Sequence, residues 1–147
     1  LGVMGGSYGG FMTNWVIGNT TRFAAACSQR SISNWVSKCM TTDIGYYFNM
    51  DQIKADPWNS PEKMWQHSPL KYANMAKTPT LFIQSDEDYR CWMGDAIQMF
   101  SALKYFGVEA RMCLFHGENH ELSRSGKPKH RIRRMTEMME WFEKYLK

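Results

Sequence analysis

The first residue that could do chemistry is a serine in a glycine-rich turn, Gly5-Gly6-Ser7-Tyr8-Gly9-Gly10. The run fits the pattern G-x-S-x-G, in which a serine sits on a sharp turn between a strand and a helix with its hydroxyl exposed. Such a turn holds the serine in a strained backbone conformation that costs roughly 1–3 kcal/mol. Glycines beside it let strand, helix and ligand approach closely. Taken alone, the motif fits equally well with a turn whose serine has no chemical role.

Two polar loops later in the chain carry the partners that a reactive serine needs. Asp88 lies in a loop after the apolar segment Thr80–Gln84, and His120 lies in one after Val108–Phe115. Ligands of parallel α/β sheets gather at the carboxyl ends of the strands, so both loops stand where catalytic groups are expected.

The three residue types together favour acyl-transfer chemistry. Serine becomes a nucleophile when an imidazole accepts its proton, and a carboxylate orients that imidazole. The chain order Ser, Asp, His is the order used by α/β-hydrolases. We therefore expect Ser7 as nucleophile, His120 as base and Asp88 as the orienting acid. Asp86 competes with Asp88 for the acidic role, and His116 is expected to hydrogen-bond nearby backbone.

Strands alternating with helices are predicted to position these loops. Continuous apolar runs, the form that buried parallel strands take, predict four strands: Leu1–Met4, Phe23–Ser28, Thr80–Gln84 and Val108–Phe115. Three alanines leave a helix as the alternative for the second run. Spacing and stop signals predict four helices: Phe11–Ile17, one that starts at Pro61 with Ser60 as N-cap, Met93–Phe106 and Lys127–Lys147. The expected fold class is α/β, with four mainly parallel strands and flanking helices.

Two stretches are expected to form apolar surfaces. The segment 31–66 reads as irregular and rich in large rings, which collectively suggest a pocket wall although each single ring more simply covers the core. The C-terminal segment reads as an amphipathic helix. Its apolar stripe consists of Ile132, Met135, Met139, Phe142 and Leu146.

Charged side chains outside the three motifs read as solvated. Glu87, Glu118 and Glu121 are expected to be loop charges, and His67 and His130 are expected at the surface. A basic cluster near the last helix resembles a nucleic-acid footprint in charge alone. It lacks interleaved aromatics, and cations at a helix start oppose the helix dipole. A solvated face or an intramolecular partner in the missing half of the domain is the preferred interpretation, with no nucleic-acid partner. The cluster consists of Arg124, Lys127, Lys129, Arg131, Arg133 and Arg134.

Composition bounds the class of protein. The 147 residues are 44% hydrophobic and 22% charged, with a formal net charge of +4, which is ordinary for a globular chain. Cys27, Cys39, Cys91 and Cys113 form no C-x-x-C pair, so we expect reduced thiols, a cytoplasmic location, and neither a metal site nor a cofactor. No apolar run approaches ~20 residues, so no membrane partner is expected.

Three runs together resemble one known family. Gly5–Gly10, Asp86–Cys91 and Gly117–Pro128 closely resemble the catalytic domain of the prolyl oligopeptidase family, and the third run is the most specific. The nearest branch looks like the acylaminoacyl-peptidase and dipeptidyl-aminopeptidase-like enzymes. The resemblance covers residues 1–147 and implies a serine peptidase that acts on short peptides.

The same resemblance implies roles for individual residues. It assigns Ser7, His120 and Asp88 to the catalytic triad and favours Asp88 over Asp86. The backbone N–H of Tyr8 would be one half of the oxyanion hole. Arg90 would hold a backbone carbonyl of the bound peptide, for which a guanidinium fork is suited. Trp92 departs from the proline or small apolar residue that the family tends to have there.

Family members also have parts that residues 1–147 do not contain. An upstream half-sheet, a β-propeller and the second oxyanion donor are absent, so the expectation is a partial α/β-hydrolase domain. We expect such a chain to self-associate or to pair with the missing half of its domain. Two alternatives to the peptidase remain open: a carboxylesterase on the same triad, and an inactive interaction fragment.

Overall fold

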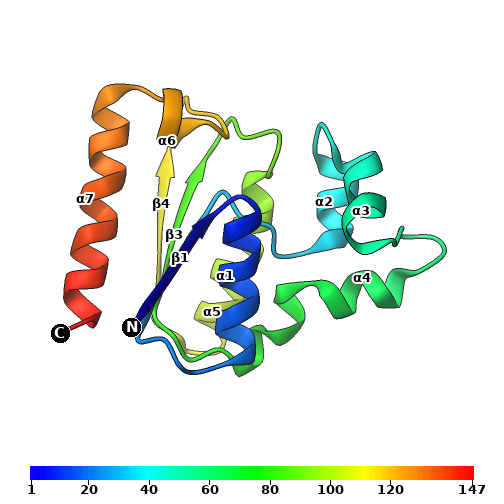
Figure 1. Cartoon of the computed structure of the whole chain (residues 1–147), viewed down its shortest axis with the longest axis horizontal. Coiled ribbons are helices and arrows are strands. Elements are labelled where there is room, and N and C mark those ends of the chain that lie inside the picture. Colours follow the sequence, from blue (N-terminus) through cyan, green and yellow to red (C-terminus); the bar gives the residue numbers. More distant parts are fainter.

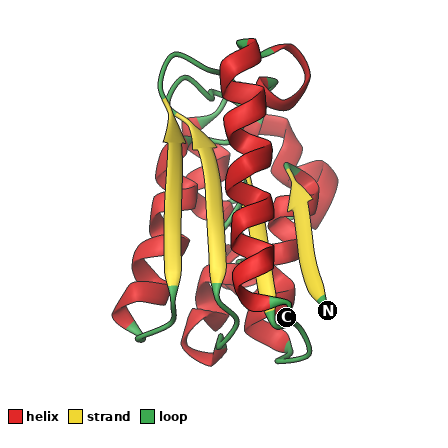
Figure 2. Cartoon of the chain, turned by 90° about the vertical axis from the view of Figure 1, so that its left-hand side faces the viewer, coloured by secondary structure: helices red, strands yellow, loops and turns green.

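The computed structural model describes residues 1–147 and contains one four-stranded parallel sheet. The strands lie side by side in chain order, and all run in the same direction (Figure 2). Their bounds are Gly2–Gly6 (β1), Ala25–Gln29 (β2), Thr80–Ser85 (β3) and Ala110–Phe115 (β4). All residues of β2 and β3 are buried, as expected for strands covered on both faces. The predicted α/β class is confirmed, and the run at Ala25 is a strand.

Helices cover both faces of the sheet. One layer contains α1 and α5, and α7 packs on the opposite face (Figure 1). The helices are Tyr8–Asn19 (α1), Trp35–Thr41 (α2), Gly45–Ile53 (α3), Pro61–His67 (α4), Met93–Tyr105 (α5), Leu122–Ser125 (α6) and Pro128–Tyr145 (α7), with a 3-10 helix at Pro69–Met75 (η1). The predicted helices are all present, and α1 begins immediately after Ser7. No helix combines the length and the apolarity that crossing a bilayer requires.

The segment 31–66 contains the main secondary-structure error of the sequence analysis, which missed α2 and α3 but predicted the start of α4 at Pro61. It folds as three short helices, α2, α3 and α4, which project to one side of the sheet (Figure 1). Each has seven or nine residues, too few for a clear helical period in the sequence. Asn34 caps α2 by accepting a hydrogen bond from the Val36 N–H. Trp35 is fully buried in a local core and Phe48 packs against that core, whereas Tyr46, Tyr47, Trp58 and Trp65 are exposed.

Ser60 precedes α4 as predicted, but its side chain does not cap that helix. The hydroxyl instead accepts the N–H of Asp56 at 3.1 Å. Pro61 has no N–H of its own and sits at the first helical position, so the helix start is already defined without the cap.

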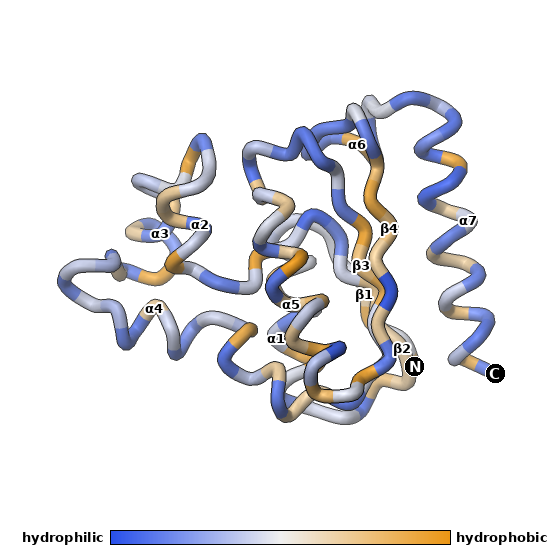
Figure 3. The backbone as a smooth tube through the Cα atoms, turned by 180° about the vertical axis from the view of Figure 1, so that it is seen from behind, coloured by the Kyte–Doolittle hydropathy of each residue, from blue (hydrophilic) through white to orange (hydrophobic).

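Most of the apolar stripe predicted along α7 is exposed, and of its five residues Phe142 packs against the core of the sheet. Met138 and Trp141 pack against the sheet, whereas Met139 is 58% exposed and Ile132 and Met135 are also exposed. Figure 3 shows α7 as largely hydrophilic beside hydrophobic strands. The helix has apolar residues on more than one face, and the face that packs on the sheet is the one that carries Met138 and Trp141. Met135, Met139 and Leu146 of the stripe line a surface hollow together with Met4 of β1.

Candidate active site

Ser7 stands on the tight turn between β1 and α1. Its backbone has φ 60 and ψ −117, a conformation that non-glycine residues rarely adopt. The turn is fixed by hydrogen bonds from the Ser7 N–H to the Gln29 carbonyl and from the Phe11 N–H to the Ser7 carbonyl, both 3.0 Å. A Cβ on Gly5 would lie 2.3 Å from the Gly9 carbonyl oxygen, so a side chain there is excluded. The strained strand–turn–helix geometry predicted from the motif is present.

Ser7, His120 and Asp88 form one hydrogen-bonded array. His120 Nε2 lies 3.0 Å from Ser7 Oγ, and His120 Nδ1 lies 2.8 Å from Asp88 Oδ2. The Asp88 side chain is fully buried and that of His120 is 13% exposed. When Nδ1–H donates to the carboxylate, Nε2 is left to accept the serine proton. The array is therefore arranged to activate Ser7.

The other oxygen of Asp88 is held by backbone. Asp88 Oδ1 accepts the N–H groups of Arg90 and Cys91 at 2.9 and 2.8 Å. These bonds curl the loop after β3 around its own carboxylate and fix the direction in which Oδ2 points. His120 consequently meets a carboxylate that is already oriented before any substrate binds.

The competing residues Asp86 and His116 pair with each other. His116 Nδ1 donates to Asp86 Oδ2, and the N–H of Gly117 donates to Oδ1 at 2.8 Å. His116 is 95% exposed, and its hydrogen bond lowers the pKa of Asp86. The predicted backbone contact of His116 is wrong, since its partner is a carboxylate. Neither residue contacts Ser7.

Glu118 and His130 are also placed differently from the sequence prediction. Glu118 is buried, and its Oε1 accepts His130 Nδ1–H at 2.6 Å and the Lys127 N–H at 3.0 Å. Burial acts to raise the pKa of Glu118, but these donors outweigh it and the pKa is lowered. The pair ties the loop of His120 to the start of α7. Glu87 is exposed as predicted, while Glu121 is half-buried and pairs with Arg124.

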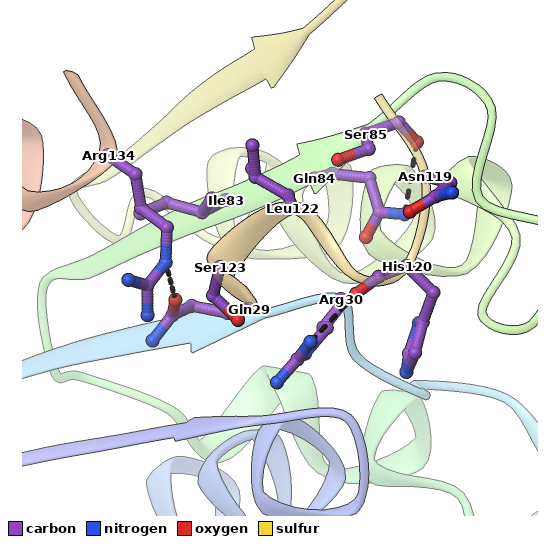
Figure 4. Close-up of a pocket in the computed structure, with 10 residues that line it drawn as sticks. All are labelled: Gln29, Arg30, Ile83, Gln84, Ser85, Asn119, His120, Leu122, Ser123 and Arg134. Atoms are coloured by element: carbon purple, nitrogen blue, oxygen red, sulfur yellow. Dashed lines mark hydrogen bonds between the residues drawn. The ribbon is translucent and has the colours of Figure 1, made fainter. Parts of the chain in front are cut away.

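Arg30 is a residue of the site that sequence reasoning missed. Its Nη1 donates to the backbone carbonyl of His120 at 2.7 Å (Figure 4). The guanidinium also lies against the elbow, where a Cβ on Gly6 would meet Arg30 Nε at 3.0 Å. Arg30 thus spans from the serine turn to the histidine loop. No motif marks it, because its two contacts come from segments far away in the chain.

A second arginine lies beside Arg30 around a small polar cavity. Arg134 Nε donates to Gln29 Oε1 at 2.7 Å (Figure 4). Burial lowers the pKa of Arg134. Arg124, Arg133 and Arg134 of the basic cluster therefore have polar partners within the chain, whereas the sequence analysis had placed an intramolecular partner in the missing half of the domain.

A cavity of about 360 Å³ opens beside Ser7 and His120. Arg90 lies on its wall, and its Nε and Nη2 bind the carboxylate of Asp43 at 3.0 and 2.8 Å. This bidentate bond lowers the pKa of Asp43 and raises that of Arg90. The contact orients the guanidinium while leaving Nη1 without a partner in the chain.

Tyr8 lines the same cavity. It is the first residue of α1, so its N–H has no hydrogen-bond partner within the helix. The positive end of the helix dipole strengthens the pull of this N–H on a negative oxygen. Its position fits the predicted oxyanion donor.

Cys91 also lines the cavity and is buried. Burial raises its pKa to about 12, so the side chain stays a thiol at neutral pH and does not act as a second nucleophile. No group of three or more His, Cys, Asp or Glu side chains is placed to hold a metal ion.

Comparisons with known proteins agree with this geometry. A family model described as the prolyl oligopeptidase family matches residues 1–147. The chain is 49% identical to the uncharacterized peptidase YuxL of Bacillus subtilis, over 99% of the chain and 22% of that protein. The solved Pyrococcus horikoshii acylaminoacyl peptidase matches with TM-score 0.95 and 37% identity, over 99% of this chain and 24% of that one. An acylaminoacyl peptidase in complex with Z-Gly-Gly-Phe-chloromethyl ketone matches with TM-score 0.95 and 38% identity, over the same shares.

These likenesses establish the fold as α/β-hydrolase, with a mainly parallel sheet and flanking helices. The chain spans 22% of the length of the Bacillus subtilis relative that it matches.

Proposed function

The chain belongs to the prolyl oligopeptidase family, and from this premise we propose that the protein hydrolyses peptide bonds of short peptides through an acyl-serine intermediate. The observation that carries the proposal is the array of Ser7, His120 and Asp88, whose two hydrogen bonds are 3.0 and 2.8 Å long. Its support is chemical as well as geometric, since a hydroxyl, an imidazole and a carboxylate are the groups that the three roles require.

In the first half of the reaction, Ser7 Oγ attacks the scissile carbonyl while His120 Nε2 accepts the serine proton. Asp88 stabilises the imidazolium that forms, because its carboxylate accepts the Nδ1 proton throughout. The Tyr8 N–H donates to the oxyanion of the tetrahedral intermediate. Collapse of the intermediate breaks the C–N bond, and His120 gives its proton to the departing amine. The acyl group is then bonded to Ser7 Oγ.

In the second half, water replaces the amine. His120 Nε2 takes a proton from the water as it attacks the ester carbonyl, and later returns it to Ser7 Oγ. The products are the free carboxylic acid and the original enzyme, so no net proton or electron is required from elsewhere.

Arg90 is proposed to hold a backbone carbonyl of the bound peptide. Its Nη1 is unpartnered, and Asp43 fixes the rest of the guanidinium at the cavity wall. Two N–H groups on one nitrogen suit a carbonyl oxygen. One acylaminoacyl peptidase to which the chain is similar was solved in complex with Z-Gly-Gly-Phe-chloromethyl ketone. This complex supports a peptide as the ligand class.

The test uses the full-length protein and one substitution, Ser7→Ala. We expect peptidase activity to fall by about 10⁴-fold or more, while the circular dichroism spectrum and melting temperature stay close to those of the wild type. Ser101→Ala, an exposed position on α5, is the matched control and should retain activity. Fluorophosphonate should label the wild type and the control but not Ser7→Ala.

Retention of more than about one per cent of activity by Ser7→Ala would contradict the proposal. Comparing matched peptide and ester substrates separates a peptidase from a carboxylesterase, because only the peptidase turns over the amide efficiently. Absence of labelling in the wild type would favour an inactive interaction protein. The cytoplasmic location and self-association stay predictions.

A further inference from the structure

Lys38 is a buried cation on the wall of the cavity beside Ser7. It is 1% exposed, yet it lines that cavity together with the reactive serine. Its Nζ donates to the backbone carbonyl of Arg90, lies 3.8 Å from Cys91 Sγ, and sits 5.2 Å from the centre of the Phe48 ring. An ammonium group has three N–H donors, and here only one strong acceptor, a neutral carbonyl, meets it.

The other cations of the cavity are already neutralised. Arg90 forms its ion pair with Asp43, and Arg124 forms one with Glu121. Lys38 forms no ion pair with any carboxylate of the chain. Among the lysine and arginine side chains that line the cavity, it alone is left without an anionic partner.

A buried carboxyl lies near Lys38 but is engaged elsewhere. Asp95 Oδ1 accepts hydrogen bonds from the backbone of Ser33 and Asn34 and from the hydroxyls of Ser33 and Ser37, whereas Oδ2 has no hydrogen-bond partner. Burial raises the pKa of Asp95, and the charge of Lys38 acts in the opposite direction. The two groups therefore sense each other electrostatically without forming a hydrogen bond.

An ammonium buried without an anion is unfavourable unless something compensates it. The surrounding wall contributes Ile32, Ile44 and Phe48, which keep the local dielectric low. Low dielectric strengthens the attraction between Lys38 and any anion that enters the cavity. The cavity therefore suits a ligand side chain that has apolar methylene groups along its length and a negative charge at its end.

We infer that Lys38 selects substrates in which the residue that donates the scissile carbonyl is acidic, Asp or Glu. The inference rests on the proposed function, because Ser7, His120 and the Tyr8 N–H together fix where that carbonyl sits. The side chain next to the carbonyl must then enter the cavity that adjoins Ser7. Its methylene groups pack on the apolar wall, and its carboxylate accepts the free N–H groups of Lys38.

The experiment measures kcat/KM of the full-length protein on three substrates that differ only in the residue donating the carbonyl: Glu, Gln or Met. Gln has the shape of Glu without its charge, and Met has a similar length without polar ends. We expect the wild type to prefer Glu over Gln by roughly ten- to a hundredfold, the usual worth of a hydrogen bond between charged groups. Lys38→Met should lower the Glu-to-Gln ratio by at least about tenfold.

Two further variants make the result specific to the charge of Lys38. Lys38→Arg keeps a cation on the wall and should keep a preference for Glu. Lys104→Met removes an exposed lysine on α5 that does not line the cavity, and it should leave the ratio unchanged. High salt should weaken the Glu preference less than it weakens exposed ion pairs, because the site is enclosed.

A wild type that hydrolyses Gln or Met substrates as well as Glu overturns the inference, and this measurement needs no variant to fold. A Glu-to-Gln ratio that is unchanged in Lys38→Met also overturns it. In both cases fluorophosphonate labelling of Ser7 leaves the proposed peptidase function standing. Absence of labelling together with no hydrolysis of any peptide overturns both.

Discussion

Two aspartate–histidine pairs lie at the same edge of the sheet, on the loops that follow β3 and β4. Asp88 pairs with His120 and Asp86 pairs with His116. In each pair one carboxylate oxygen accepts an imidazole N–H and the other accepts backbone N–H groups. Judged by hydrogen bonds alone, the pairs are nearly equivalent.

Burial and a third partner distinguish them. In the inner pair, Asp88 and His120, the aspartate side chain is 0% exposed and the imidazole is 13% exposed. In the outer pair, Asp86 and His116, the imidazole is 95% exposed. Only the inner imidazole reaches Ser7. An exposed ion pair is screened by water and contributes little. The comparison teaches that an Asp–His pair can take part in catalysis only when it is buried and when the second ring nitrogen of the histidine meets a reactive group, here the Ser7 hydroxyl.

The largest expected effect comes from exchanging the acids for amides. Asp88→Asn should lower kcat by about 10³–10⁴-fold, because an amide N–H facing Nδ1 favours the wrong imidazole tautomer. Steady-state kinetics of the full-length protein on a short peptide measures the loss. The melting temperature should change little, since the amide retains the shape of the carboxylate.

Asp86→Asn is the matched control for that substitution. It should change kcat by less than about threefold, because Asp86 hydrogen-bonds to His116 and Gly117 and to neither Ser7 nor His120, and substitutions away from such machinery usually change free energies by about 0.5 kcal/mol or less. An equal loss of kcat in Asp88→Asn and Asp86→Asn would contradict the distinction between the two pairs, and it would make Asp86 and His116 part of the catalytic machinery.

The sequence was sufficient to predict the strands and the order of the chemical groups. Ser7, Asp88 and His120 each follow an apolar run that is recognisable as a strand, and parallel strands bring their carboxyl ends to one edge. Choosing Asp88 over Asp86 needed the family resemblance, because both follow the same strand and differ only in which way their loop turns.

The rest depended on contacts between segments distant in the chain. Glu118 and His130 read as surface charges until the fold places the start of α7 over the histidine loop. No sequence motif marks Lys38, and its burial follows only once α2 packs beside the loop of Arg90. Hydrophobic periodicity gives a helix its apolar residues but does not say which of them will meet the sheet, as the stripe on α7 demonstrates.

A smaller effect is expected at Arg30, which supports only the inner pair. Its Nη1 holds the carbonyl of His120, while His116 is exposed. Arg30→Met should lower kcat by roughly 10- to 100-fold, because displacing a catalytic group by about 1 Å has effects of that size. The rate of fluorophosphonate labelling should fall in parallel, since it depends on the same imidazole.

Arg30→Lys should recover part of that loss, because an ammonium group can still donate to the carbonyl of His120. Arg22→Met, at an exposed arginine outside the site, should behave like the wild type. Wild-type kinetics for Arg30→Met would show that the histidine loop is held sufficiently by its other contacts.

The smallest effect is expected at Glu118, which lies between the two histidines in the sequence. Its carboxylate accepts the His130 imidazole and the Lys127 N–H, and so fixes the loop that keeps His120 inside while His116 remains outside. The pKa of Glu118 is lowered from its ordinary value of 4.5 in the folded protein. The ionised group therefore stabilises the fold above that ordinary value, and the stabilisation is lost as the pH falls through the lowered pKa.

Glu118→Gln keeps an acceptor oxygen but cannot titrate, so it isolates the contribution of the charge. We expect the variant to be less stable than the wild type at neutral pH by about 1 kcal/mol, the net worth of a hydrogen bond. The difference should shrink as the pH falls below 4.5, because the wild-type carboxylate then becomes neutral too. Urea unfolding of the full-length protein at a series of pH values measures both quantities. A difference that stays constant with pH would mean that the shape of Glu118, rather than its charge, holds the loop, and the enclosure of His120 would then depend on packing alone.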